Sequence, residues 1–282
     1  MKIQLSLAVV ASLSLLGCPE SPPASTTGDA ATATATSATA SATVSAAAEP
    51  VKAGKVFFVT PLDGAQVFPE VDVNMGTENR EIVAAGSAAG DASKGHFWVF
   101  VDDDAPPKGT KLTADDTHVA FAKGEKVGSL TGLSEGKHKL TLLLADAEGK
   151  AYGPELSQTV AVEVVAAQGE AKVDILEPKD GATVKPKFTV KFGVEGMPIK
   201  PAGEAPKDRT SGHHHLLVNM GAMPPGEEIP NDATHKHYGK GQTEVEVELA
   251  PGDYELTAQF ADGSHRSYGE KLAKTIKITV AE

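Results

Sequence analysis

The chain contains one sequence pattern twice, and this internal repeat limits the folds that it can adopt. Residues 57–165 align with residues 174–280, and both copies open on the motif Pro-x-Asp-Gly-Ala-x-Val. His96 of the first copy and His213 of the second lie 117 residues apart, and other matched positions keep that spacing. A constant spacing indicates a duplication, and each copy of about 110 residues is long enough to form its own core.

Within each copy, apolar and polar residues alternate over short runs and do not recur at helical spacing. In residues 188–194, Phe and Val occupy every second position, and in residues 244–249 Glu and apolar residues alternate. Such alternation is typical of strands with one buried face. Roughly seven such runs in each copy, separated by Gly, Pro and Asp, predict an all-β fold of two tandem immunoglobulin-like antiparallel sandwiches.

The first residues predict export and attachment to lipid. Residues 5–16 form an apolar run that is too short to span a membrane, and we assign residues 1–17 to a signal peptide. The sequence Leu-Leu-Gly before Cys18 resembles a lipobox, and Cys18 is the chain's single cysteine. We expect an acylated Cys18 to hold the protein in a lipid bilayer of the cell envelope. Pro19, in place of an aspartate, favours the outer membrane, with the protein on its periplasmic or surface face.

Composition then divides the rest of the chain. Residues 18–52 are rich in Ala, Thr and Ser and carry few charges, so we expect a disordered stalk. We expect the first sandwich at residues 53–166 and the second at residues 170–282. The formal net charge of −12 argues against nucleic acid as a partner, because binding to phosphates needs a basic surface.

Histidines are concentrated in the second copy, which holds His213, His214, His215, His235, His237 and His265. Because alternate residues of a strand share a face, His213 and His215 should point one way and His214 the other. His235 and His237 should share a face in the same manner. Two such pairs on neighbouring strands predict a site for Cu(II) or Zn(II). His265, in a hairpin-like turn, either completes that site or faces water.

The first copy has other residues at these positions, and we therefore expect that it has lost the metal site. Phe97, Trp98, Ala120 and Gly149 stand where the second copy has His214, His215, His237 and His265. The alignment with Phe97 also places the His214 side chain in the core. Acidic runs at residues 102–104 and 115–116 suggest either calcium binding or a solvated loop, and the spacing of an EF-hand is absent.

Several of these motifs resemble one known family. The opening turn, Pro-Ala-Gly at residues 201–203, the histidine motif of residues 212–217 and residues 235–244 are similar to the bacterial domain-of-unknown-function family 4399. The resemblance is strong over residues 172–282 and partial over residues 55–165. It implies an exported all-β domain with a histidine motif, and it implies no activity.

Two classes of function follow from the sequence. The first is a non-enzymatic envelope protein that binds a divalent transition metal, Cu(II) or Zn(II), through ligands drawn from His213, His215, His235, His237 and His265. The second is a structural or interaction module, with structural histidines, that contacts an envelope protein or a polysaccharide. A hydrolase with Glu227 or Glu244 as base has the least support, because the chain lacks the nucleophile-elbow, phosphate-loop and dinucleotide motifs.

Overall fold

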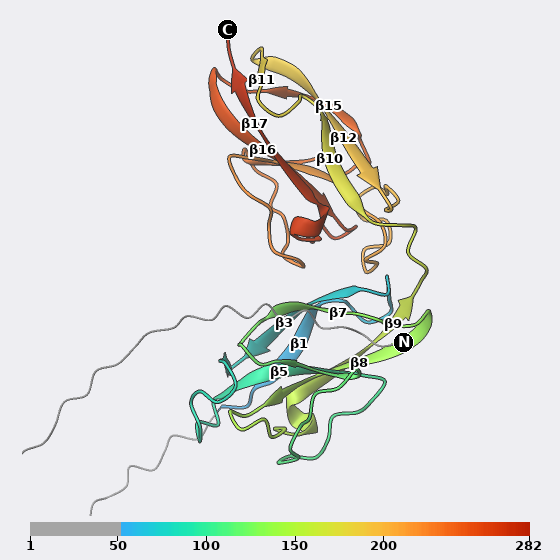
Figure 1. Ribbon diagram of the computed structural model, residues 1–282, viewed down its shortest axis with the longest axis vertical. Coiled ribbons are helices and arrows are strands. Elements are labelled where there is room, and N and C mark those ends of the chain that lie inside the picture. Colours follow the sequence, from blue (N-terminus) through green and yellow to red (C-terminus); the bar gives the residue numbers. More distant parts are fainter. Residues whose placement is uncertain (1–51) are drawn as a thin grey trace, which may run out of the picture. The chain divides into compact units, whose positions relative to one another are not determined.

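The computed structural model describes residues 52–282 of the chain (Figure 1). The predicted signal peptide, Cys18 and nearly all of the predicted stalk lie outside these residues. The described residues form strands β1 to β17 and two short 3₁₀ helices. No helix among them is long and apolar enough to cross a membrane.

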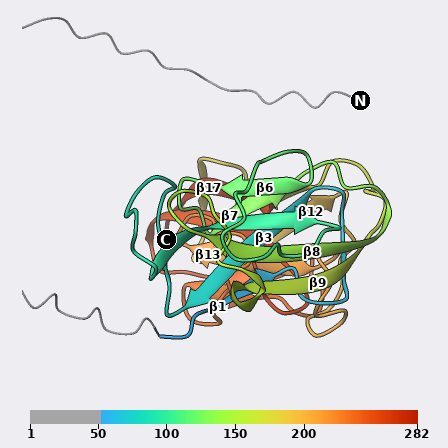
Figure 2. The same cartoon turned by 90° about the horizontal axis from the view of Figure 1, so that it is seen from below.

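The first sandwich is built from β1 to β9 and the helix η1. Its elements are β1 (Lys55–Thr60), β2 (Ala65–Val67), β3 (Val71–Glu78), β4 (Glu81–Ile82), β5 (Lys94–Val101), β6 (His118–Phe121), β7 (Val127–Leu130), β8 (Gly136–Ala145), η1 (Pro154–Leu156) and β9 (Ser157–Val164). One sheet has the order β1-β3-β7 and the other the order β2-β9-β8-β5-β4, with β6 paired to β5. Strands β8 and β9 lie side by side (Figure 2).

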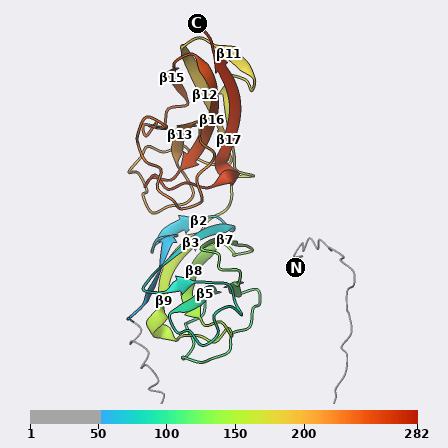
Figure 3. The same ribbon diagram turned by 90° about the vertical axis from the view of Figure 1, so that its left-hand side faces the viewer.

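The second sandwich repeats this arrangement. Its elements are β10 (Lys172–Glu177), β11 (Ala182–Val184), β12 (Lys187–Glu195), β13 (His213–Val218), β14 (His235–His237), β15 (Glu244–Glu248), β16 (Gly252–Ala261), η2 (Glu270–Leu272) and β17 (Ala273–Val280). The sheets have the orders β10-β12-β15 and β11-β17-β16-β13-β14, and Figure 3 shows β13, β16 and β17 together. The predicted all-β fold of two tandem immunoglobulin-like sandwiches is confirmed.

The repeated opening motif forms the turn between the first two strands of each sandwich. Gly64 and Gly181 adopt φ values of 79° and 76°, which glycine takes at little cost. The aspartate before each glycine binds the last strand of its own sandwich, because Asp63 Oδ1 accepts from the Ala161 N–H and Asp180 Oδ1 from the Lys277 N–H, both at 2.8 Å. The motif therefore sets the turn and joins it to the last strand of the same sandwich, which also pairs with the strand after the turn.

Strands in which apolar and polar residues alternate bury their apolar face. In β17, Ile276, Ile278 and Val280 are buried, whereas Lys277 and Thr279 between them are exposed. The central strands β5 and β13 differ, because most residues of β5 and all residues of β13 are buried. Each has one face in the core between the sheets and the other face under loops. The histidine site lies on that outer, loop-covered face of β13.

Candidate metal centre

Strand β13 places two histidines on the outer face of its sheet. His215 pairs with His237 of β14 on one side and with Gln259 of β16 on the other. Residues opposite each other in a ladder point to the same face, so His237 joins His213 and His215 on this face. In the structure, His213 and His215 thus share one face of β13, as predicted from the sequence.

Four histidines come together at this face: His213, His215, His237 and His265. One ring nitrogen from each lies within 4.8 Å of a ring nitrogen from every other. The ring centroids are 4.6 to 5.8 Å apart. This is the only group of three or more metal-ligand side chains at such spacing among residues 52–282. We call these four residues the histidine cluster.

His213 and His215 have the geometry of two ligands of one ion. Their Nε2 atoms face each other at 3.1 Å. Two imidazole nitrogens bound to one tetrahedral Zn(II) at about 2.0–2.1 Å would be separated by roughly 3.3 Å. The ring nitrogens of His237 and His265 lie within 4.8 Å of those of the other two, so a tetrahedral site would require the four nitrogens to approach this closer separation.

Burial keeps three histidines of the cluster, His213, His215 and His237, in the neutral form that can bind metal. His213 and His215 are fully buried, and His237 and His265 are partly buried at the rim. Burial, together with the neighbouring histidines, lowers the pKa of His213 to about 4 and that of His215 to about 2. The pKa of His237 is lowered as well, by burial and by His265. A neutral imidazole has a free lone pair, so these three histidines are ready to coordinate a metal at neutral pH.

Several nitrogens of the cluster lack hydrogen bonds. Nδ1 of His213, Nδ1 of His215 and Nε2 of His237 are buried without a partner, as are both ring nitrogens of His214 in the core and Nδ1 of His96 in the first sandwich. Buried polar atoms are nearly always paired, and an unpaired one needs a specific explanation such as an ion. An ion held by the facing Nε2 atoms of His213 and His215 would leave both Nδ1 atoms unpaired, so Nε2 of His237 is the one of these three nitrogens that such an ion could satisfy.

The structure does not bring His235 into the cluster. Its Nδ1 contacts Asp232 at 2.9 and 3.0 Å, and it lies opposite Leu217, one step further along the strand pair. The first sandwich has the same arrangement, in which His118 Nδ1 contacts Asp115 at 2.8 Å. Because both copies keep this His–Asp pair, it belongs to the fold. Our expectation that His235 supplies a ligand therefore has no geometric support.

His214 points to the opposite face, as expected. It is fully buried in the core, where its ring stacks on Phe192 at 4.8 Å and meets Phe260 edge-on at 5.1 Å. Burial lowers its pKa to about 4. It therefore acts as an aromatic core residue.

In the first sandwich, the corresponding face is apolar. Strand β5 pairs Trp98 with Ala120 and Leu143, at the positions of His215, His237 and Gln259. Trp98 and Leu143 belong to a buried apolar group with Phe100, Leu112, Ala145 and Ala151. The one histidine kept here, His96, accepts a hydrogen bond from Trp98. Apolar packing thus takes the place of the cluster.

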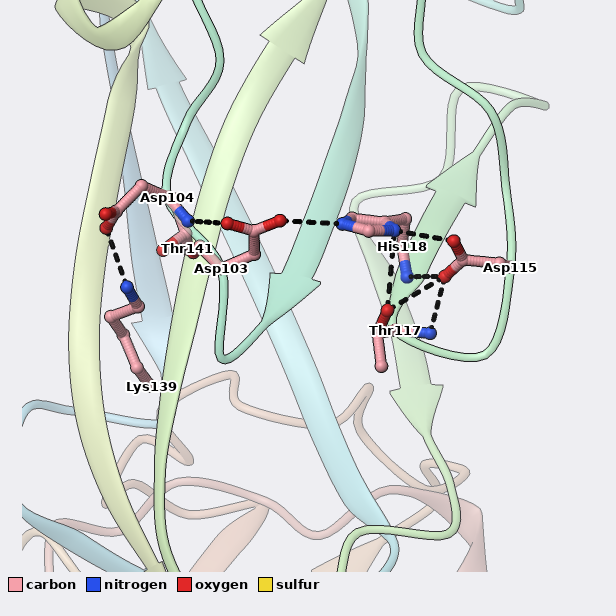
Figure 4. Close-up of polar contacts among 7 residues, drawn as sticks. All are labelled: Asp103, Asp104, Asp115, Thr117, His118, Lys139 and Thr141. Atoms are coloured by element: carbon pink, nitrogen blue, oxygen red, sulfur yellow. Dashed lines mark hydrogen bonds and ion pairs between the residues drawn. The ribbon is translucent and has the colours of Figure 1, made fainter.

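The acidic runs of the first sandwich are occupied by the protein's own groups (Figure 4). His118 lies between Asp115 and Asp103, with Nε2 at 3.3 Å from Asp103, and Lys139 binds Asp104 at 2.7 Å. These carboxylates are largely exposed. The arrangement is that of a solvated acidic loop with internal ion pairs.

Three residues that support the cluster were not predicted from the sequence. A Cβ on Gly239 would lie 2.2 Å from Nε2 of His237, so a glycine here makes room for that ring. Asp262 organises the turn that carries His265, and Arg209 binds Asp262. The sequence signal that could have identified Gly239 is its position two residues after His237. Arg209 is separated from Asp262 by 53 residues, and strand periodicity gives no information on such a pair.

Solved structures with related folds are similar at low identity. The fibronectin(III)-like modules of Clostridium thermocellum CbhA are 14% identical, with a TM-score of 0.28, and the match covers 80% of this chain and 93% of that chain. The N-terminal Ig1-2 module of the Drosophila receptor protein tyrosine phosphatase DLAR is 10% identical, with a TM-score of 0.28 and coverage of 81% and 99%. No curated protein matches the sequence.

One protein family matches both sandwiches. The model of the family described as "Domain of unknown function (DUF4399)" matches residues 73–165 and residues 190–281. The two matches together cover more than half of the chain and correspond to the two copies of the repeat. The chain therefore belongs to the DUF4399 family, of which it carries two domains in tandem.

Proposed function

We propose that this protein is a non-enzymatic metal-binding protein of the cell envelope. One divalent transition-metal ion, Cu(II) or Zn(II), binds the histidine cluster of the second sandwich. Its ligands are His213, His215, His237 and His265. Imidazole is a preferred ligand of both ions, whereas calcium and magnesium prefer oxygen ligands.

The observation that carries this proposal is the convergence of four imidazoles from three separate segments. The segments are β13, β14 and the turn after β16, and their ring nitrogens lie within 4.8 Å of one another. Bringing four polar rings together under a loop layer costs desolvation free energy. An ion that binds all four imidazoles would offset this cost.

The alternative is a structural role for the same residues. A structural network would use hydrogen bonds between its rings, such as the one that Trp98 donates to Nε2 of His96, although Nδ1 of His96 is buried without a partner. In the cluster, one contact joins His213 and His215, and the buried nitrogens without a partner do not decide between the two roles, because His214 and His96 have such nitrogens as well. The convergence of four ring nitrogens within 4.8 Å is what favours metal coordination.

We further propose that acylated Cys18 attaches the protein to the outer membrane. This proposal rests on the signal peptide and lipobox pattern of residues 1–18. Radiolabelled palmitate should be incorporated into the wild-type protein, and the protein should sediment with outer-membrane vesicles. Both properties should be lost in Cys18→Ser, and a Cys18→Ser protein that remains in the membrane fraction would contradict the proposal.

Isothermal titration calorimetry tests metal binding. The lipid-free chain from residue 18 onward, with Cys18→Ser, is titrated with Cu(II) and Zn(II). We expect one ion per chain, with a Kd below about 1 μM for at least one metal. His213→Ala should weaken this binding by at least tenfold, because four ligands become three.

Two histidines outside the cluster provide matched controls. His235→Ala and His118→Ala each remove an imidazole that is bonded to an aspartate, one in each sandwich. Both variants should keep the wild-type metal affinity. Weak wild-type binding, or equal binding by His213→Ala, would favour the structural alternative.

A further inference from the structure

His265 belongs to a tight turn that Asp262 organises. Asp262 Oδ1 accepts hydrogen bonds from the N–H groups of Ser264 and Arg266, both at 2.9 Å. The backbone oxygen of Asp262 also accepts from the N–H of His265 at 2.9 Å. His265 adopts a φ of 63°, in the left-handed region that side-chain-bearing residues seldom occupy. This conformation lets the turn present the imidazole to the cluster.

The first sandwich contains the same turn with glycine at that position. Asp146 Oδ1 accepts from the N–H of Lys150 at 2.8 Å, and the N–H of Gly149 donates to the Asp146 backbone oxygen at 2.9 Å. Gly149 has a φ of 72°, which is favourable for glycine. The second sandwich thus keeps an imidazole where the same backbone accommodates glycine more easily. Such a side chain persists where the surrounding structure holds the turn in place.

Arg209 supplies that support. Its Nη1 donates to Asp262 Oδ2 at 2.8 Å and to the backbone oxygen of Arg266 at 3.1 Å, while Nη2 donates to the backbone oxygen of Ser267 at 3.0 Å. Its guanidinium group also lies over the Tyr268 ring, 4.2 Å from the centroid. One planar group therefore binds both the start and the end of the turn that carries His265.

The ion pair is buried, and only the second sandwich has it. The side chains of Arg209 and Asp262 are 6% and 2% exposed. At the position of Arg209 the first sandwich has Ala92, and no ion pair is formed by Asp146 among the described residues. Burying two charges is costly, and an aspartate alone suffices to form the turn in the first sandwich. The added arginine thus accompanies the added histidine.

From this geometry we infer that Arg209 and Asp262 are positioning residues that hold His265 as the fourth ligand of the metal centre. This inference rests on the proposed metal-binding function. The pair acts through His265 alone, because the remaining three histidines are supplied by β13 and β14. Loss of the pair leaves a three-histidine site with one position open to water.

A double-mutant cycle on the lipid-free full chain, titrated with Zn(II) and Cu(II), tests this inference. The principal variant is Arg209→Met with Asp262→Asn, which removes both charges and keeps an oxygen that can accept the N–H bonds of the turn. We expect its metal affinity to fall about ten- to a hundredfold, as for His265→Ala. Added to His265→Ala, the same double substitution should have no further effect. Added to His237→Ala, it should lower the affinity by its full factor.

A second variant separates positioning from folding. Arg209→Lys keeps the charge opposite Asp262 and loses the planar fork that reaches Arg266 and Ser267, so its affinity should lie between wild type and the double variant. Cu(II) electron paramagnetic resonance should report four nitrogens in the wild type and three in the double variant. Two results would overturn the inference and leave the proposed metal-binding function intact. One is a folded double variant with wild-type metal affinity. The other is a double substitution that lowers metal affinity by the same factor in the His265→Ala background as in the wild type. Absence of metal binding by the wild type would overturn both the inference and the proposed function.

Discussion

Nε1 of Trp98 donates a hydrogen bond of 2.9 Å to Nε2 of His96 in the first sandwich. At the same two positions of the second sandwich, Nε2 of His215 faces Nε2 of His213 at 3.1 Å. An indole N–H can only donate, whereas an imidazole nitrogen can also bind a metal. Where the second sandwich has two potential metal ligands, His213 and His215, the first sandwich therefore has a hydrogen-bonded pair, because Trp98 stands at the position of His215.

This relationship predicts that two equivalent substitutions affect different properties, namely stability for His96→Ala and metal affinity for His213→Ala. His96→Ala leaves the Trp98 N–H buried and unpaired, which should lower the free energy of unfolding of the first sandwich by about 1–3 kcal/mol. His213→Ala should weaken metal binding and leave the first sandwich unchanged. Because Trp98 is the chain's single tryptophan, its fluorescence during urea denaturation reports on the first sandwich. A change in metal affinity caused by His96→Ala would contradict this assignment.

Gly239 gives a test of the position of His237. A methyl group at residue 239 would lie 2.2 Å from His237 Nε2, so Gly239→Ala should displace the ring and lower metal affinity by about tenfold. The φ of Gly239 is not in the left-handed region, so no backbone strain accompanies this change. Gly221→Ala is the control, because no atom lies within 4 Å of its added methyl group. Isothermal titration of both variants should show a loss of affinity only for Gly239→Ala.

The sequence predicted the parts of the site that depend on strand alternation. The repeat and the alternating runs predict two sandwiches, and alternation predicts that His213 and His215 share a face while His214 enters the core. Alternation defines a face, and it does not define a position along that face. His235 lies on the predicted face, one step away from the cluster and bonded to Asp232.

The remaining parts depend on contacts between distant segments. The position of His265 follows from a turn in which a non-glycine residue takes a φ of 63°, and no local pattern specifies that turn as a ligand donor. Arg209 is a comparable case, because its partner Asp262 lies 53 residues further along the chain. The difference between Ala92 and Arg209 in the repeat was the available sign that this position had changed.

Acidification should destabilise the metal-free second sandwich. Burial lowers the pKa of His213 to about 4, whereas a histidine in the unfolded chain titrates near 6.5. Protons therefore bind the unfolded state more strongly, so stability is full above about pH 6.5 and falls as the pH decreases toward 4. His213 alone should lower the free energy of unfolding by roughly 2–3 kcal/mol between pH 7 and 4.5.

Urea denaturation in the presence of a chelator, followed by circular dichroism at several pH values, measures this loss. Trp98 fluorescence identifies the separate transition of the first sandwich. His213→Gln removes the titrating group and should reduce the dependence on pH. A wild-type transition of the second sandwich that stays constant from pH 7 to 4.5 would be inconsistent with neutral, buried histidines in the folded state.

His118 should give the first sandwich a pH dependence of the opposite sign. Burial alone would lower its pKa, but hydrogen bonds and charge interactions with Asp115 and Asp103 outweigh burial and raise it (Figure 4). A raised pKa means that the stabilisation is full below about pH 6.5 and is lost as the pH rises through the folded-state pKa. Because Asp115 and Asp103 are exposed to solvent, we expect a loss of less than about 1 kcal/mol.

Denaturation followed by Trp98 fluorescence between pH 6.5 and 8.5 tests this effect. The pKa of His96 is lowered by burial, so His96 is neutral in both folded and unfolded states over most of this range and contributes little there. The urea midpoint of the wild type should therefore fall as the pH rises, and the midpoint of His118→Gln should stay nearly constant, since Gln does not titrate. Equal slopes for the two proteins would show that the folded state does not favour the protonated form of His118, and would contradict a raised pKa for this residue.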